Sequence, residues 1–579
     1  CLILSCLISI ILFFVARTHD DTASSVTFPT TAPSTSPTTN PTFSLNGLRS
    51  FLVDTLPSLE RSFSDPQSPQ SQALSWLEDN EAVMRYSDFR LTQRFALGVL
   101  YFALDGENWS DSGYWMSDRN ECEWAYGNAI PCNPKGELKD LSLSFNLLRG
   151  FLPEEIVLLT ALERIDVGGN RAIRGSIPTL IERLTSLVNL DLSSNNIVGS
   201  VPTQLQQLTD LRLLILLNNR LSGTLESGFF SMKNLTYLGL SSNEISGTFP
   251  SDFNVSTTFA LQTLDFEDNR LSGTIPTELG LISTLTELSL RDNAFTGSFP
   301  SEIGDLIEMA NLDLSYNSLN STIPTEIGRM TRLETLYYRC DDNPSSGQRR
   351  GTWGLIPSEI GNLNGLIELD LRQSGLSGTM PTELGNMNNI VILHLEGNRI
   401  FGPIPSSIGN LSNLEMINLE SNLLSGTIPD SIERLQYVRH ISFNDNTDLS
   451  GTLPTVLGKL EYLEYLDVRK CGLTGPIPSE LGLLQFLSHF FTSDSGIGGT
   501  IPEELGMSLT DSLANGRYVF GASQTGTMPA RVCTNLKAAG IDVKAACRSF
   551  KCSCCSFDCK NDNRDDSRNS NSNSNSYSN

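Results

Sequence analysis

The chain has 579 residues, which is too long for one hydrophobic core, because single cores stop growing near about 250–300 residues. It therefore contains several domains or an array of repeats. The formal charge of −25, from 65 acidic and 40 basic residues, argues against nucleic acid and anionic lipid as partners and leaves basic peptides, cations and neutral glycans.

The N-terminal segment is apolar. Residues 1–16 (CLILSCLISIILFFVA) carry no charge and fall just short of the roughly 20 residues that span a bilayer. The chain begins with Cys rather than Met, so we expect upstream residues and predict a truncated membrane anchor; the apolar region of a signal peptide is the alternative. Either one places the following residues outside the cytoplasm. Residues 17–44, rich in Thr, Ser and Pro, predict an extended stalk, either O-glycosylated or unmodified.

Residues 45–137 are predicted to form an N-terminal cap. Apolar residues spaced by three or four over residues 89–104 indicate a helix. Cys122 and Cys132 then bracket a tryptophan just before the repeats begin. We predict that these two cysteines form a disulfide. It would hold a small cap over the end of the repeats, which would otherwise expose their apolar core to water.

Proline residues mark a repeating unit through most of the chain. Most of these prolines lie 24 residues apart, and each follows an apolar residue. Between them runs the pattern L-x-x-L-x-L-x-x-N, for example from Leu187 to Asn195. The marks are Pro153, Pro178, Pro202, Pro250, Pro276, Pro300, Pro324, Pro357, Pro381, Pro405, Pro429, Pro454, Pro478, Pro502 and Pro529.

This pattern resembles the plant-type leucine-rich-repeat family, whose unit reads LxxLxxLxLxxNxLxGxIPxxLGxLxx. The resemblance covers about residues 138–529, as fifteen units and a degenerate sixteenth, and reaches back to residue 122 with the cysteine cap. It implies an α/β-type leucine-rich-repeat solenoid, which is a curved right-handed superhelix with parallel strands on its concave face. The family includes receptor kinases, but the chain has no glycine-rich loop with a partner Lys, no HRD and no DFG.

The physical chemistry of one unit agrees with this fold. The leucines of a single unit cannot form a core, whereas stacked units share a continuous one. The Asn can bond backbone groups that the bend leaves unpaired, and Pro favours an extended turn on the opposite side. Asn occupies eleven of the fifteen units, and Asp341, Ser374, Cys471 and Ser495 replace it in the others.

We place the solenoid at residues 138–530, with an insertion near 340–353 that carries two arginines, and a polar, disordered tail at 561–579. Residues 531–560 are predicted to form a cysteine-rich C-terminal cap, with disulfides in one of fifteen connectivities or, as the alternative, bound zinc. Cys471, in an Asn position, is predicted to be a buried free thiol. The cysteines of the C-terminal cap are Cys533, Cys547, Cys552, Cys554, Cys555 and Cys559.

Side chains between the strand leucines are expected to point out of the concave face. One column is acidic, which indicates either a track for cations or basic peptides or a merely solvated face. One repeat and its neighbour carry apolar residues there, which indicate a contact patch, or else self-packing or a lateral dimer contact. The acidic column holds Asp166, Asp191, Asp265, Asp313, Asp370 and Asp467, and the apolar patch consists of Leu213, Ile215, Leu217 and Tyr237.

A second patch combines arginine, tyrosine and histidine on neighbouring repeats beside the insertion. Arginine and aromatic side chains are frequent anchors of interfaces, and paired arginines can bind a carboxylate or sulfate. We predict that this patch, together with Arg349 and Arg350 of the insertion, binds the ligand. The arginine–tyrosine patch consists of Arg291, Tyr316, Tyr337, Arg339, Arg372 and His394.

The function predicted from these features is recognition without catalysis. We expect a receptor-like module at the cell surface, anchored by its N-terminus or secreted if that segment is cleaved, that binds a peptide, protein or glycan and works with a signalling co-receptor. No cofactor, metal or nucleic acid is expected. The alternatives are a structural or adhesive surface or wall protein and an inhibitor of extracellular hydrolases. Glycosylation sequons that fit a secretory route begin at Asn108, Asn234, Asn254, Asn320 and Asn410.

Overall fold

The computed structural model describes most of the region expected to hold the cap and the repeats, and residues 41–556 form one compact unit. Among the described residues, no helix combines the length and apolarity that crossing a bilayer requires. The expected membrane segment, stalk, insertion and tail lie outside the described residues, as do Asn254, Cys340 and the cysteines from Cys547 to Cys559. The described residues are 45–80, 86–124, 131–252, 260–320, 322–339, 354–505, 507, 516–521, 526–545 and 550–551.

The N-terminal cap is helical. Its longest helix, α5, begins after Ser87, whose hydroxyl accepts a hydrogen bond from the backbone N–H of Arg90 at 3.4 Å. Cys122 and Cys132 are joined by a disulfide, with their Cα atoms 5.5 Å apart. The elements are α2 (Leu45–Thr55), α3 (Leu59–Ser62), α4 (Pro69–Glu78), α5 (Asp88–Ala103), and the 3-10 helices η2 (Gly106–Asn108) and η3 (Glu121–Glu123).

Helix α5 closes the first repeat through its side chains. Gln93 accepts a hydrogen bond from the backbone N–H of Leu138 at 2.8 Å and donates to the carbonyl of Gly136 at 3.1 Å. Arg94 and Glu121 form an ion pair whose side chains are 0% and 1% exposed. The cap therefore covers the apolar end of the stack and contains a charged pair within its own core.

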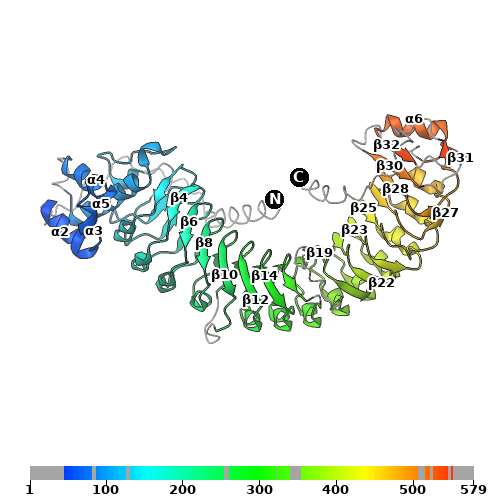
Figure 1. Ribbon diagram of the computed structural model, residues 1–579, viewed down its shortest axis with the longest axis horizontal. Coiled ribbons are helices and arrows are strands. Elements are labelled where there is room, and N and C mark those ends of the chain that lie inside the picture. The colour runs from blue at the N-terminus through cyan, green and yellow to red at the C-terminus, as the bar shows by residue number, and fades with distance from the viewer. Residues whose placement is uncertain are drawn as a thin grey trace, which may run out of the picture. The chain divides into compact units, whose positions relative to one another are not determined.

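The repeats share one parallel sheet of 17 described strands. The central leucines lie opposite one another from strand to strand, as Leu190, Leu214 and Leu238 do, and all three are fully buried. The units stack side by side in a curved array with this sheet on the concave side (Figure 1). The strands are β1 (Asp140–Ser142), β3 (Arg164–Asp166), β5 (Asn189–Asp191), β7 (Leu213–Ile215), β9 (Tyr237–Gly239), β11 (Thr263–Asp265), β13 (Glu287–Ser289), β15 (Asn311–Asp313), β17 (Thr335–Tyr337), β19 (Glu368–Asp370), β21 (Ile392–His394), β23 (Met416–Asn418), β25 (His440–Ser442), β26 (Tyr465–Asp467), β28 (His489–Phe491), β30 (Arg517–Phe520) and β32 (Asp542–Ala545).

The asparagines at the ends of the strands bind backbone groups of two repeats at once. Asn219 donates from Nδ2 to the carbonyls of Leu192 at 2.9 Å and Leu216 at 3.1 Å, and its Oδ1 accepts from the N–H of Ile197 at 3.0 Å. Each such bond satisfies a buried backbone group that would otherwise cost about 1–3 kcal/mol. The role predicted for this position is confirmed.

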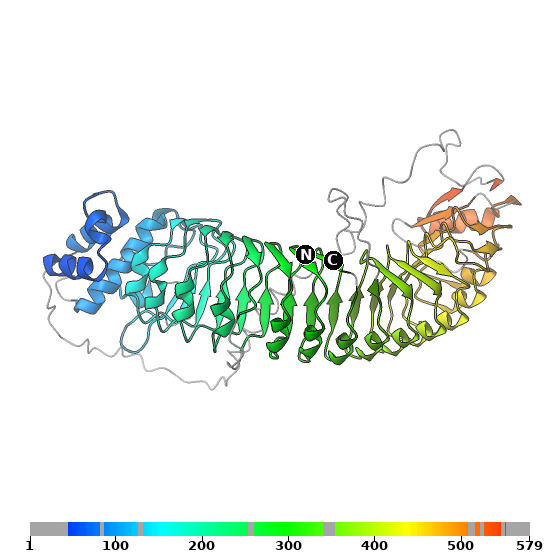
Figure 2. The same cartoon turned by 60° about the horizontal axis from the view of Figure 1, so that its bottom comes forward.

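A second set of short parallel strands follows the asparagines, where the sequence predicted only an extended turn. A glycine such as Gly247, with φ of 88°, occurs near the end of these strands, in the left-handed region that glycine adopts readily. Figure 2 shows these strands running beside the main sheet. They are β2 (Arg149–Phe151), β4 (Ala172–Gly175), β6 (Asn196–Gly199), β8 (Arg220–Gly223), β10 (Glu244–Thr248), β12 (Arg270–Thr274), β14 (Ala294–Gly297) and β16 (Ser318–Leu319) in one sheet, β18 (Gly354–Leu355), β20 (Leu376–Thr379), β22 (Arg399–Pro403) and β24 (Leu423–Ser425) in another, and the pairs β27 (Thr474–Gly475) with β29 (Gly496–Ile497) and β31 (Gly526–Thr527) with β33 (Phe550–Lys551).

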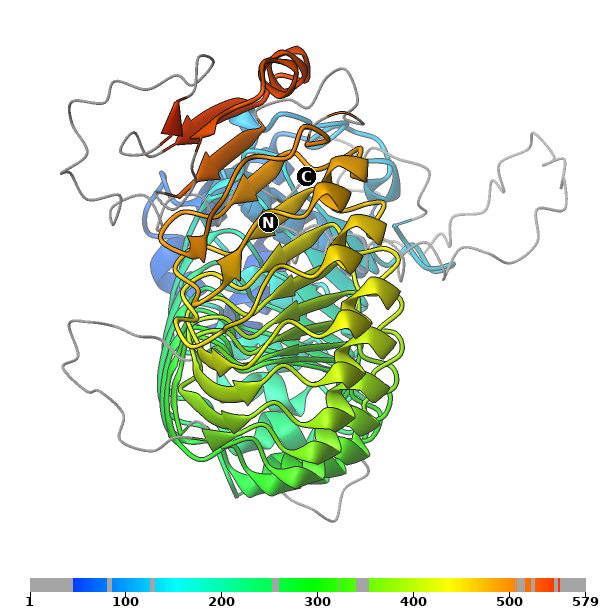
Figure 3. The same cartoon turned by 90° about the vertical axis from the view of Figure 1, so that its right-hand side faces the viewer.

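Most of the proline marks precede 3-10 helices, which Figure 3 shows gathered along one side of the stack. Glu226 takes the place of proline in one repeat with φ of −92° and ψ of 140°, so the extended conformation is retained without the ring. The helices are η4 (Glu154–Leu158), η5 (Thr179–Arg183), η6 (Thr203–Gln207), η7 (Ser227–Ser231), η8 (Thr277–Leu281), η9 (Ser301–Asp305), η10 (Thr325–Arg329), η12 (Ser358–Asn362), η13 (Thr382–Asn386), η14 (Ser406–Asn410), η15 (Asp430–Arg434), η16 (Thr455–Lys459) and η17 (Ser479–Leu483).

The main sheet extends beyond residue 530, where the solenoid was expected to end. Strands β30 and β32 continue it in parallel register, and helix α6 (Ala530–Ala538) lies between them in the chain. Cys533, on α6, is disulfide-bonded. Cys471 is a buried free thiol, as predicted, and its sulfur donates to the carbonyl of Phe443 at 3.2 Å in place of the usual amide.

We predict that replacing Glu121 by Ala destabilises the cap by about 3–5 kcal/mol, because Arg94 would stay buried without its carboxylate. The measurement is hydrogen exchange of the amides of α5. As a control, Glu163→Ala removes an exposed pair with Lys139, whose charged atoms are 3.8 Å apart, and should cost about 0–1 kcal/mol. Equal losses in the two variants would contradict the prediction.

We predict that the thiol of Cys471 resists alkylation in the folded protein, because burial raises its pKa to about 12 and leaves little thiolate at neutral pH. The test is iodoacetamide labelling at pH 8, followed by mass spectrometry of the peptide that contains Cys471. Labelling should require guanidinium. Equally fast labelling of the folded and unfolded protein would be inconsistent with a buried thiol.

Candidate ligand-binding surface

The parallel register aligns equivalent side chains of successive repeats into columns across the concave sheet. The residue after each central leucine forms one column, so that Asp265, Ser289 and Asp313 lie on neighbouring strands in direct register. The residue before each central leucine, such as Glu287, forms a second column. The residue two positions after each member of the first column, such as Glu267 after Asp265, forms a third. A ligand on this face would contact several repeats at once.

The acidic column is not a merely solvated face, because its aspartates are buried or half-buried and hydrogen-bonded. Asp313 is buried, and its Oδ1 accepts a hydrogen bond from the backbone N–H of Ser315 at 2.8 Å. The same bond from an N–H two residues later occurs in the whole column. These aspartates thus fix the backbone just after the strands, a role that the sequence analysis missed. They are Asp166, Asp191, Asp265, Asp313, Asp370 and Asp467.

The arginine–tyrosine patch is assembled by the fold around Tyr316. The guanidinium groups of Arg291 and Arg339 lie 4.5 Å and 4.6 Å from the centre of the Tyr316 ring, which is cation–π geometry. Arg339 also donates from Nη1 to the Tyr316 hydroxyl at 2.5 Å and from Nη2 to the side chain of Gln373 at 2.8 Å. The structure therefore brings together residues from four consecutive repeats.

Most charges in this patch are neutralised within the chain, which corrects the expectation of a free basic surface. The Nε of Arg291 lies 3.2 Å from Oε1 of Glu267. Other members bind carboxylates in the same way: Tyr337 donates to Glu368 at 2.8 Å, Arg372 pairs with Asp370 and Glu396, and His394 Nδ1 lies 3.2 Å from Glu396.

Arg339 differs from its neighbours. Within the described residues it forms no ion pair, and its Nε is buried without a hydrogen-bond partner. A guanidinium carries five N–H donors, so a buried donor without an acceptor is costly and favours an acceptor from a ligand. Arg349 and Arg350, which were expected to act beside it, lie outside the described residues.

The apolar patch is also assembled, but it is less exposed than expected. Ile215 is 8% exposed, and Leu213, Leu217 and Tyr237 are half-buried beside it. The ring of Tyr237 lies over Gly239. If this glycine carried a Cβ atom, that atom would be only 2.6 Å from Cε1 of the ring. The hydroxyl of Tyr237 is buried and has no hydrogen-bond partner in the described part of the chain.

An acidic cluster, defined as Asp265, Glu267, Glu287 and Asp313, separates the two patches. Burial raises the pKa of Glu267 to about 7; Arg291 opposes this shift and the neighbouring carboxylates add to it. Burial likewise raises the pKa of the other three members. Arg291 is the one cation that forms a salt bridge to this cluster among the described residues. The concave face therefore holds an excess of poorly solvated negative charge here.

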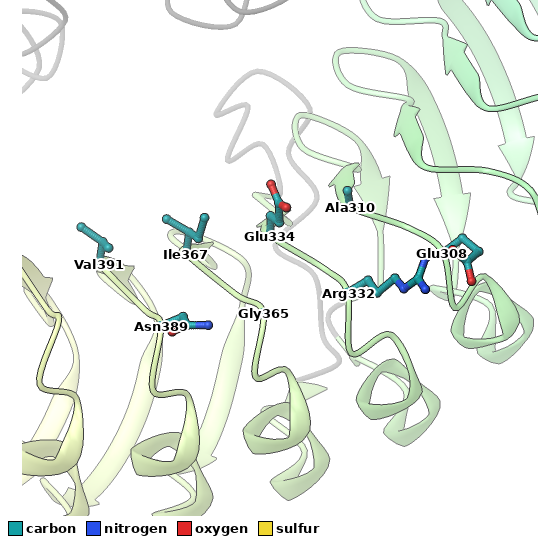
Figure 4. A pocket seen from close by; sticks show the side chains of 8 residues that line it. All are labelled: Glu308, Ala310, Arg332, Glu334, Gly365, Ile367, Asn389 and Val391. Carbon is teal, nitrogen blue, oxygen red and sulfur yellow. Dashed lines mark hydrogen bonds and ion pairs between the residues drawn. The ribbon is translucent and has the colours of Figure 1, made fainter.

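The flank of the main sheet carries a shallow groove of about 730 Å³. Figure 4 shows Ala310, Glu334, Ile367 and Val391 in a row across four successive repeats, while Glu308 and Arg332 approach each other and form an ion pair. The side chain of Ile367 is 44% exposed. This groove lies beside the N-terminal ends of the strands that carry the arginine–tyrosine patch.

The sequence analysis missed an aromatic column on the C-terminal repeats. His440 stacks on Tyr465 with ring centres 4.0 Å apart, and Tyr465 stacks on His489 at 5.8 Å. Each of these three residues precedes the central apolar residue of its strand, and the strands are consecutive. Aligning equivalent positions of successive repeats could therefore have found them. Burial lowers the pKa of His440 to about 4, and His394 and His489 contribute to the shift.

Among the described residues, no group of three or more His, Cys, Asp or Glu is arranged to hold a metal ion. The described sequon asparagines are all exposed: they are Asn108, Asn234, Asn320 and Asn410.

Comparison with known proteins places this geometry among leucine-rich-repeat structures. The leucine-rich-repeat family model matches residues 186–208, 234–255, 260–281, 284–306, 309–330, 389–411, 413–435 and 462–484. No curated protein matches the chain.

The similar solved structures include plant receptor ectodomains. The plant peptide hormone receptor RGFR1, in complex with RGF2, is 30% identical with a TM-score of 0.59, and the match covers 72% of this chain and 68% of that one. The ectodomain of the Arabidopsis receptor kinase HAESA, in complex with an IDA peptide hormone, is 29% identical with a TM-score of 0.59 and 70% of each chain covered. The ectodomain of GASSHO1/SCHENGEN3 from Arabidopsis thaliana, in complex with CASPARIAN STRIP INTEGRITY FACTOR 2, is 29% identical with a TM-score of 0.56. That match covers 72% of this chain, which spans about half (51%) of the GASSHO1 chain.

We predict that the folded protein loses stability as the pH rises from 5.5 to 7.5, in part through Glu267. Its pKa of about 7 in the folded state exceeds the ordinary value of 4.5, so folding favours the protonated form and this contribution disappears as the carboxyl ionises. The measurement is the thermal midpoint against pH for the wild type and Glu267→Gln, whose profile should be flatter.

A matched control is Glu433→Gln, on η15. A hydrogen bond from Lys459 lowers the pKa of Glu433, so this group stays ionised over the same range and its removal should leave the slope unchanged. His440 acts in the opposite sense, because its lowered pKa costs stability as the pH falls from the ordinary value of 6.5 to about 4. Parallel profiles for the wild type and Glu267→Gln would contradict the assignment.

Proposed function

This chain belongs to the leucine-rich-repeat family, and from that premise we propose that it is an extracellular recognition module that binds a peptide along its concave sheet. The observation that carries the proposal is Arg339, a half-buried side chain on the concave face whose Nε is buried and unsatisfied among the described residues. A peptide carbonyl or carboxylate placed over Arg339 would supply the missing acceptor.

Two further observations support a peptide rather than a bulky globular partner. The concave columns lie on strands separated by about 4.8 Å, so that an extended chain crossing them meets a new set of side chains at each repeat. The structures of RGFR1 and HAESA were solved with peptide hormones bound. The proposal extends to a signalling co-receptor and to anchoring at the membrane through residues 1–16, and it includes no catalytic step.

The adhesive and the hydrolase-inhibitor alternatives have no comparable support among the described residues. Retention by insoluble wall material alone, without a saturable soluble ligand, would favour the adhesive function. Inhibition of an extracellular hydrolase by the purified protein would favour the other.

We predict that Arg339→Gln weakens peptide binding about tenfold to a hundredfold, because a hydrogen bond to a charged group contributes about 1.5–3 kcal/mol. The probe is a dodecapeptide selected from a random displayed library on the purified chain, and the readout is fluorescence anisotropy. The control is Arg329→Gln on η10, which removes the same charge from an exposed pair with Asp305. Equal affinity of the two variants would remove Arg339 from the site.

A further inference from the structure

The apolar patch and the acidic cluster adjoin each other on the concave sheet. Ile215, Gly239 and Asp265 lie in direct register on strands β7, β9 and β11. The Tyr237 ring lies over Gly239, so its hydroxyl is at the boundary between the two groups. Apolar contact surface and uncompensated negative charge therefore meet within three strands.

Two polar atoms at this boundary are buried and unsatisfied. The hydroxyl of Tyr237 and the hydroxyl of Ser289 have no hydrogen-bond partner among the described residues. Ser289 lies between Asp265 and Asp313 in the same column. Buried hydroxyls without partners are rare in native proteins and indicate a missing partner. Here the missing partner would lie against carboxylates, so it is a donor with positive charge.

The charge balance leads to the same conclusion. Arg291 lies 3.2 Å from Glu267 and 3.7 Å from Asp313. Among the described residues, Asp265 accepts hydrogen bonds from the hydroxyl of Ser241 and a backbone N–H, Glu287 accepts one from the hydroxyl of Thr263, and neither forms an ion pair. Carboxylates held out of water without a counter-ion raise the energy of the free protein. A cationic ligand would lower that energy, and it would do so more strongly than on an open surface because the site is partly desolvated.

We propose that the acidic cluster and the apolar patch form one subsite, which takes an arginine or lysine side chain of an extended peptide together with an apolar side chain four residues away. Ile215 and Ser289 are separated by three strand spacings of about 4.8 Å, which is about 14 Å, and residues i and i+4 of an extended peptide lie on the same face about 13 Å apart. A basic side chain over Ser289 and an apolar one over Ile215 are then both within reach. This inference rests on the proposed peptide-binding function and adds the charge of the ligand to it.

The closing experiment compares two synthetic nonapeptides by fluorescence anisotropy on the full chain. Both carry leucine at positions 1 and 9 and serine elsewhere, and position 5 is arginine in the basic peptide and glutamate in the acidic one. The basic peptide should bind saturably, and more weakly as salt is raised. Glu267→Gln with Glu287→Gln should reduce its affinity about tenfold or more. The matched control is Asp305→Asn with Glu433→Gln, which removes the same charge from the 3-10 helices and should leave the affinity unchanged.

Tyr237→Phe separates ligand binding from a structural role. Removing an unsatisfied buried hydroxyl should raise the thermal midpoint of the free protein, while the affinity for the basic peptide should fall. A merely structural tyrosine would not weaken binding while raising stability. Unchanged affinity in both the Tyr237 and the double-glutamate variants would overturn the inference, as would equal binding of the acidic peptide.

Failure of this inference is distinguishable from failure of the proposed function. If the library-selected peptide still depends on Arg339 while the double-glutamate variant binds the basic peptide as tightly as the control, the subsite is wrong and the function stands. If no peptide of either charge binds and the selected peptide is insensitive to Arg339→Gln, both fail.

Discussion

The structure depends on one constraint, which is that every repeat must turn its backbone inward without leaving buried N–H and C=O groups unpaired. In most repeats the asparagine after the main strand meets it: Asn317 donates to the carbonyls of Leu290 at 2.8 Å and Leu314 at 3.2 Å and accepts from the N–H of Phe295 at 3.0 Å. Because each amide bonds its own repeat and the one before it, the stacking of the units and the turn within each unit are stabilised together.

This arrangement confines function to side chains that the fold does not use. The leucine column and the asparagines are committed to the core, and Oδ1 of each aspartate in the acidic column accepts a hydrogen bond from the backbone just after its strand. The free positions are those on either side of these columns, where Tyr237, Glu287 and Arg339 lie. Desolvation on the concave side then amplifies electrostatics, as in Glu267, whose pKa is raised by burial despite the neighbouring Arg291.

The repeat spacing was enough to predict the strands, their parallel register and the role of the asparagines, because these depend on a pattern that recurs every 24 residues. It also placed the residues of both patches next to one another. It did not predict the second set of strands. These strands are only two to five residues long, which is too short for a recognisable alternation of apolar and polar residues. Nor did it predict that Arg291 pairs with Glu267, which depends on side-chain rotamers. Arg291 and Glu267 lie 24 residues apart, at equivalent positions of neighbouring repeats. Comparing equivalent positions could therefore have found this pair.

The most direct test of the account is hydroxyl-radical footprinting of the chain with and without the library-selected peptide. Binding on the concave sheet should protect Tyr237, Tyr316 and Tyr337 from oxidation. Leu281 and Ile307, which are 49% and 52% exposed in or next to the 3-10 helices of the same stretch of repeats, should stay equally reactive. Protection of Leu281 and Ile307 with unchanged oxidation of the three tyrosines would place the ligand on another face and contradict the account.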